Sequence, residues 1–245
     1  MQGKTVVIIG GSSGMGLAVA KAALQEGAKV SIAGRSQERL AAARSSLNDD
    51  VRTFVADVSS EASVQNIFQQ HDHIDHLFIT TGRFAVQKIM ETHPDEFRQT
   101  LEERIFGTLF AIRAAVPKMQ QSGSITLTSS VSVDRPIPGI TMTTLGHAAT
   151  RTLARCLALE LAPIRVNAIA VGWIDTPLVK NFLQDEYEAV IRDVSKAIPV
   201  NRIGKSEEVA DAVIMLMKNG YISGEILNIT GGQHIGDLNT EWSKI

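Results

Sequence analysis

The stretch GGSSGMG, residues 10–16, lies between a short β-branched run and a segment with apolar residues at helical spacing. Gly10 permits a tight exit from a strand, Gly14 lets backbone approach a pyrophosphate, and Gly16 lets a helix pack on a sheet. The N–H groups at the start of that helix would face the anion. An unliganded glycine-rich loop is the alternative, but the strand–turn–helix context favours a nucleotide site. We expect the contacts to come from Gly10, Ser12, Ser13, Gly14, Met15 and Gly16.

Beyond this turn, short apolar runs alternate with longer helical patterns along the chain. Strands are expected at 5–9, 30–33, 51–56, 77–80, 125–128, 165–170 and 225–229, and helices at 14–26, 37–47, 60–70, 94–119, 143–161 and 207–217. Such alternation produces a parallel sheet with helices on both faces, because the crossovers are right-handed. We therefore predict one domain over 1–245: an α/β, Rossmann-type, doubly wound parallel sheet of about seven strands. Residues 176–200 interrupt the alternation and are expected to form a lid-like insertion over a ligand.

Composition excludes several classes of function. A net charge of −2 makes nucleic acid and anionic membranes poor partners. The single cysteine, Cys156, rules out an internal disulfide and a cysteine metal cluster, and we expect no metal site. The chain shows neither a signal-peptide layout at its start nor an apolar run of transmembrane length, so we expect a soluble cytoplasmic protein.

The end of the second expected strand indicates which dinucleotide binds. NAD sites usually place an acidic residue there to bind the ribose hydroxyls. Here the strand ends Ala33-Gly34-Arg35-Ser36, without a carboxylate to repel a 2′-phosphate. Arg35 could pair with that phosphate, although it could also be a solvated surface arginine. We predict NADP(H) rather than NAD(H).

Further short motifs follow several of the expected strands. They are Ala56-Asp57-Val58, Thr80-Thr81-Gly82, Arg165-Val166-Asn167-Ala168 and Asp175-Thr176-Pro177. With the glycine turn, they resemble the motifs of the short-chain dehydrogenase/reductase family over nearly the whole chain. The resemblance implies an oxidoreductase fold in which Asp57 contacts adenine. It also implies that Val58, Gly82, His147 and Thr176 belong to the cofactor site.

The positions that carry catalysis in this family differ here. Family members usually use Asn, Ser, Tyr and Lys, with Tyr exchanging the proton and Lys lowering its pKa. The matching positions of this chain hold Arg104, Ser130, Thr143 and His147. Only Ser130 keeps the family residue, and its hydroxyl could bind a polar ligand group or satisfy backbone. We therefore predict a degenerate active site.

The replacements weaken acid–base chemistry. The Thr143 hydroxyl is a poor general acid near neutral pH. His147, one helical turn away, has a reference pKa of about 6.5 and could protonate a substrate directly, through Thr143 or through a water. We favour the alternative that His147 is packed or contacts ribose. Arg104 could bind a ligand anion or Asp134, but we favour solvent-facing positions for Arg104 and Arg83, a residue that could border the cleft.

Three functions remain open from the sequence. The first is an NADP(H)-dependent oxidoreductase of unknown carbonyl or alcohol substrate, with little activity on common alcohols and ketones. The second is a catalytically inactive cofactor-binding sensor or partner subunit, and the third is a non-redox lyase or isomerase. The resemblance implies a homotetramer or homodimer, and residues 143–161 are more apolar than one buried face requires.

Overall fold

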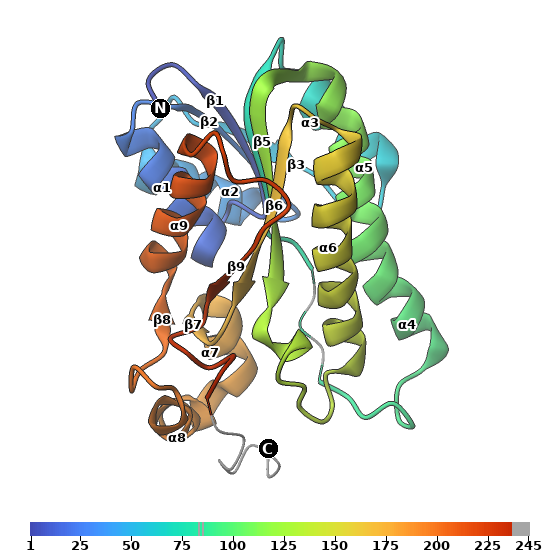
Figure 1. Ribbon diagram of the computed structural model, residues 1–245, viewed down its shortest axis with the longest axis vertical. Helices are drawn as coiled ribbons and strands as arrows, with labels where there is room; N and C mark the ends of the chain where they lie inside the picture. Colours follow the sequence, from blue (N-terminus) through green and yellow to red (C-terminus); the bar gives the residue numbers. More distant parts are fainter. Residues whose placement is uncertain (83, 85, 237–245) are drawn as a thin grey trace.

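A parallel sheet of seven strands forms the centre of the protein, in the order β3-β2-β1-β4-β5-β6-β9 (Figure 1). The strands are β1 (Thr5–Ile9), β2 (Lys29–Gly34), β3 (Arg52–Val55), β4 (Ile74–Ile79), β5 (Met119–Ser130), β6 (Arg165–Val171) and β9 (Ile226–Ile229). The computed structural model describes residues 1–82, 84 and 86–236. The strand order reverses between β1 and β4, and ligands of open α/β sheets bind at such a switch point. The predicted doubly wound fold is confirmed.

Helices cover both faces of this sheet, as Figure 1 shows. On one face pack α1 (Gly14–Gln25), α2 (Gln37–Leu47) and α9 (Ser206–Lys218). On the other lie α3 (Glu61–Gln69), α4 (Pro94–Leu101), α5 (Gly107–Ala115) and α6 (Thr141–Glu160). Successive strand side chains point to opposite faces, so Val6 and Ile8 join the first core while Val7 and Ile9 join the second. No helix within the described residues is both long and apolar enough to span a membrane.

The helix predicted over 94–119 is present almost to its expected end but is not regular. A π-helical turn, Glu102–Phe106, separates α4 from α5, and a 3₁₀ turn, Val116–Lys118, leads into β5. Pro117 lacks the N–H needed to continue a helix, which explains the end of α5. The π turn places Glu103 and Arg104 in buried positions, and such bulges are frequent at functional sites.

The segment predicted as an insertion lies beyond the carboxyl ends of the strands (Figure 1). It contains α7 (Pro177–Leu183), a 3₁₀ turn (Gln184–Glu186) and α8 (Tyr187–Ala197). A two-stranded sheet of β7 (Ile174–Asp175) and β8 (Gly204–Lys205) brackets it. The start of α7 packs on the glycine turn, since a Cβ at Gly14 would lie 3.3 Å from the Thr176 side chain. This position suits a lid, and its closing over a ligand stays a prediction.

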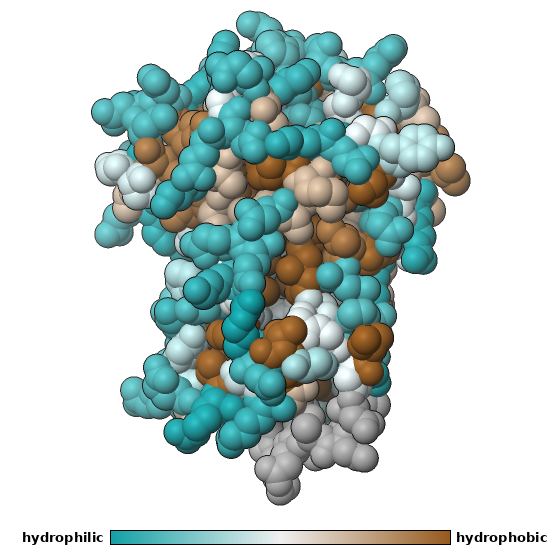
Figure 2. Space-filling view, turned by 60° about the vertical axis from the view of Figure 1, so that its left-hand side comes forward, coloured by the Kyte–Doolittle hydropathy of each residue, from teal (hydrophilic) through white to brown (hydrophobic). Residues whose placement is uncertain are grey.

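Much of the surface in Figure 2 is hydrophilic, but hydrophobic residues gather along the middle and lower part of that face.

Candidate active site

The glycine turn presents an open helix N-terminus. Ser13 precedes α1 and makes no side-chain cap, whereas Ser36 and Ser60 accept a backbone N–H of the helices that they cap. The N–H groups of the first turn of α1 are therefore not satisfied by a capping side chain. Gly16 has no room for a Cβ beside the Gly10 carbonyl, which keeps helix and strand in close contact. An anion such as a pyrophosphate fits this arrangement.

A groove runs beside this turn over the carboxyl ends of β1, β2 and β4. Most of the residues predicted to bind the cofactor line it: Gly10, Ser12, Ser13, Gly14, Met15, Gly16, Arg35, Val58, Gly82 and Thr176. Asp57 does not. Its carboxylate accepts from the Ser59 backbone and hydroxyl, which lowers the pKa of Asp57, while its neighbours Ala56 and Val58 face the groove. The contact of Asp57 with adenine therefore stays a prediction.

Two charged residues of the groove were missed by the sequence analysis. Arg39 lies in the first turn of α2, shortly after Arg35 in the sequence, and this proximity could have revealed it. Glu103 comes from the π turn, and its Oε1 lies 3.7 Å from Arg35 Nη1. As expected, the end of β2 has no carboxylate that would face a 2′-phosphate, but the groove as a whole contains the carboxylate of Glu103. No local pattern in the sequence signals this acid, because the irregular turn brings it in.

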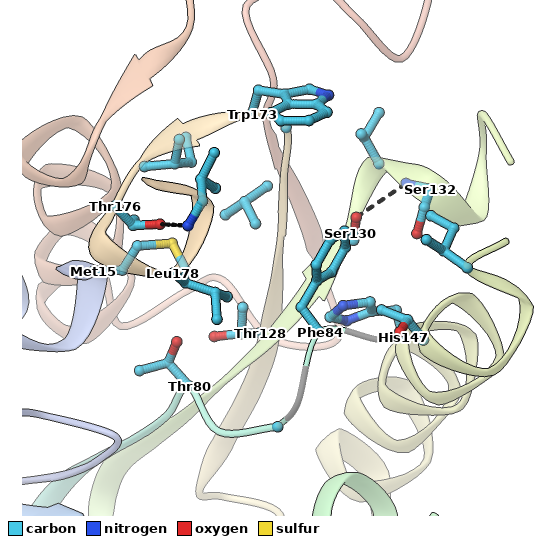
Figure 3. Close-up of a pocket in the computed structure, with 18 of the residues that line it drawn as sticks. Met15, Thr80, Phe84, Thr128, Ser130, Ser132, His147, Trp173, Thr176 and Leu178 are labelled. Atoms are coloured by element: carbon cyan, nitrogen blue, oxygen red, sulfur yellow. Dashed lines mark hydrogen bonds between the residues drawn. The ribbon is translucent and has the colours of Figure 1, made fainter. Parts of the chain in front are cut away.

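The groove opens into a cavity of about 220 Å³. The two share the lining residues Met15, Thr80, Thr81, Gly82, Thr176 and Leu178. In Figure 3, Ser130, Ser132 and His147 lie on one side of the cavity, and Met15 and Leu178 on the other. All four residues at the family's catalytic positions line this cavity: Arg104, Ser130, Thr143 and His147. A ligand that follows the groove would reach them.

The His147 side chain has two polar partners. Arg104 Nη1 lies 3.4 Å from Nδ1, and a hydrogen bond joins His147 to the Thr128 backbone. Burial, followed by the Arg104 charge, lowers the pKa of His147 well below its usual value. The imidazole is therefore neutral at neutral pH. This geometry favours a packed histidine over a proton donor.

Arg104 is buried, with 7% of its surface exposed, so the expected solvent-facing orientation is wrong. Gly82 and Gly146 leave space for its side chain, since a Cβ at either would overlap it. Burial lowers the pKa of Arg104 to about 10, which keeps the guanidinium charged at neutral pH. Asp134, one of the two partners considered, instead forms two hydrogen bonds with Arg151. Arg83 lies outside the described residues.

The remaining walls of the cavity are mostly apolar. Phe84 and Phe182 meet edge to face, with ring centroids 5.0 Å apart. Ser130 ends β5, and its Oγ accepts the Ser132 N–H at 3.1 Å in the turn that follows (Figure 3). Since the Ser130 oxygen accepts in this bond, its own proton remains available to a ligand.

Comparison with known proteins agrees with this geometry. Residues 10–234 match the family described as enoyl-(acyl carrier protein) reductase. A short-chain dehydrogenase/reductase of Acremonium sp, ucsE, is 30% identical over 96% of this chain and 97% of its own. This chain belongs to the short-chain dehydrogenase/reductase family. The human 3-oxoacyl-[acyl-carrier-protein] reductase is also 30% identical, over 94% of this chain and 97% of its own.

Solved structures of this family superpose closely on the chain. The MalC reductase/Diels-Alderase from Malbranchea aurantiaca gives a TM-score of 0.90 at 27% identity, covering 95% of this chain and 96% of that one. A small-chain dehydrogenase in complex with NADPH gives a TM-score of 0.85 at 27% identity, covering 96% of this chain and 100% of that one. The family membership expected from the sequence motifs is thus confirmed.

Proposed function

We propose that this short-chain dehydrogenase/reductase binds NADP(H) along the groove and reduces a carbonyl compound, or oxidises the alcohol, in the cavity. The continuity of groove and cavity carries the proposal, because a dinucleotide on the glycine turn would extend to the catalytic positions. When bound, the cofactor would supply or accept the hydride. The related dehydrogenase in complex with NADPH supports this choice of cofactor.

The residues of the groove fit a phosphorylated dinucleotide. The uncapped start of α1 suits the pyrophosphate, and the Ser12 and Ser13 side chains lie beside it. Arg35 and Arg39 together offer two guanidinium groups to a 2′-phosphate. The Glu103 carboxylate opposes this attraction, but two cations outnumber it.

The cavity can stabilise negative charge on a substrate oxygen better than it can supply a proton. The hydroxyl of Ser130 can donate a hydrogen bond, and the buried charge of Arg104 favours a developing alkoxide. Thr143 has no acidity comparable to that of a phenol, and His147 is neutral and held in place. We therefore expect slow turnover.

A role without hydride transfer is the second candidate. The anchoring of His147 by Arg104 and Thr128 favours it, because a proton relay through this ring would break those contacts. Such a protein would be a cofactor-binding sensor, a partner subunit, or a non-redox lyase or isomerase. The printed name of the related MalC protein includes Diels-Alderase beside reductase, which supports non-redox chemistry on this fold.

Restoring the family residues tests the proposal. Thr143→Tyr with His147→Lys is not sufficient, because a lysine at 147 would meet the Arg104 guanidinium, which already contacts His147. The triple variant with Arg104→Asn removes that repulsion. We expect it to oxidise NADPH about 10²-fold faster than wild type across a panel of ketones.

Wild type and His147→Ala serve as the matched comparison in the same assay. We expect both to be slow and similar. Fast turnover by wild type that His147→Ala abolishes would make His147 the working acid and contradict the proposal. Absence of NADPH binding by wild type would refute its cofactor part.

The proposal includes a homodimer or homotetramer in the cytoplasm. Leu145 and Leu159 are exposed on α6, and Phe106 is exposed at the end of the π turn. If these side chains lie in one patch, a second copy would cover it.

A further inference from the structure

The cavity carries positive charge in addition to the Arg104 guanidinium that would favour an alkoxide. Among its described lining residues are two arginines, Arg104 and Arg135, and neither an aspartate nor a glutamate. The acid next to Arg135 in the sequence, Asp134, gives both carboxylate oxygens to Arg151, at 2.7 and 2.6 Å. His147 is neutral and adds no charge to the cavity. Arg104 already has the Glu103 charge near it, so a ligand that brings a negative group would balance the charge of Arg135.

Ser132 lines the cavity and has a buried side-chain oxygen that the described part of the chain does not satisfy. The residue is only 5% exposed, and its Oγ has no hydrogen-bond partner among the described residues. Its backbone N–H is already donated to Ser130. An unsatisfied buried hydroxyl costs stability, and such groups in native structures commonly mark a ligand or water position. The Ser132 hydroxyl can donate to an acceptor in the cavity.

Arg135 lies three residues after Ser132 and lines the same cavity. Its Nε donates to the His234 carbonyl at 3.1 Å, a neutral acceptor that positions the guanidinium. Within the described part of the chain, no carboxylate forms a salt bridge with it. Neither Ser132 nor Arg135 lines the nucleotide groove, so both lie in the part of the cavity beyond the cofactor. Their position is that of a substrate contact.

We infer that Ser132 and Arg135 form a subsite for a carboxylate group of the substrate. A carboxylate only accepts hydrogen bonds, which matches the donors of a hydroxyl and a guanidinium. The apolar remainder of the molecule would lie against Phe84, Ile137 and Ile140. The substrate class is thus a carbonyl or hydroxy compound with an apolar body and a carboxylate. This inference rests on the proposed function, because the cavity is where substrate would meet cofactor.

Binding of two matched probes tests the subsite without turnover. Isothermal titration calorimetry would compare 4-phenylbutanoate with 4-phenylbutanamide, each with and without saturating NADP⁺. We expect the carboxylate to bind wild type about 10- to 100-fold more tightly, as a charge-assisted hydrogen-bonded contact predicts. Arg135→Gln should abolish this preference and leave the affinity for the amide unchanged.

Two further variants keep the test decisive. Ser132→Ala should weaken the carboxylate alone by about 3- to 10-fold. It serves as the main variant if Arg135→Gln does not fold, since Arg135 also holds the His234 carbonyl. Arg192→Gln, on the exposed surface of α8, should keep the full preference.

Equal affinity for the two probes, no binding of either, or a preference that survives in both cavity variants would overturn the inference. If NADP(H) binds while the carboxylate preference is absent, only the subsite fails. If the preference is present while NADP(H) does not bind, only the proposed function fails.

Discussion

Replacing Arg35 by alanine should weaken the binding of NADPH and spare that of NADH. Arg35 follows β2, lines the nucleotide groove and has a side chain that is 58% exposed. Glu103 Oε1 lies 3.7 Å from its Nη1 and faces the same groove. The 2′-phosphate is the group that distinguishes the two cofactors, so a contact with it changes one affinity only.

The structure sets the size of the effect. A hydrogen bond to a charged group contributes about 1.5–3 kcal/mol. Solvent screens a half-exposed arginine, so we take the lower end, about 1.5 kcal/mol, which is slightly more than tenfold in the dissociation constant. Removing Arg35 also removes a positive charge 3.7 Å from the Glu103 carboxylate, which would then oppose the phosphate more strongly. Glu103→Gln should therefore act in the opposite direction and tighten NADPH by about 2- to 5-fold.

Fluorescence titration of NADPH and NADH into each variant measures these changes. Arg44→Ala is the matched control, because Arg44 lies on α2, the helix that follows Arg35, but donates to the Asp49 carbonyl outside the groove. We expect its affinities to equal those of wild type. Equal affinity of wild type for the two cofactors, or an equal loss of both in Arg35→Ala, would refute the reasoning.

Three further outcomes are expected. Burial lowers the pKa of His76 to about 4, below its unfolded value of about 6.5. The free energy of unfolding, measured by urea denaturation, should therefore fall by about 3 kcal/mol as the pH is lowered from 6.5 to 4. In His76→Gln this dependence of the unfolding free energy on pH should be smaller. Gly146→Ala should displace Arg104 from His147 and thereby raise the His147 pKa, as measured by NMR titration. An unchanged His147 pKa would contradict the close packing of Arg104 against Gly146. Light scattering should show a dimer or tetramer that Leu159→Glu, at a side chain 84% exposed, reduces to the 26.5 kDa monomer.

The sequence was sufficient to predict the sheet, its helices and most of the groove. Strand and helix periodicity is local, and the steric needs of Gly10 and Gly16 arise within a few residues of chain. The family motifs extended this reading to the catalytic positions, which share one cavity.

The charges of the site depended on contacts between distant elements. Arg104 and His147 are 43 residues apart in the chain, and their contact adds to burial in lowering the pKa of the histidine. The π turn, which the helical pattern of residues 94–119 concealed, brought Glu103 to the groove and Arg104 into the cavity. Asp134 paired with Arg151 on α6 rather than with Arg104. Periodicity shows which face of an element is buried, but through-space electrostatics and packing select the partner of each buried charge.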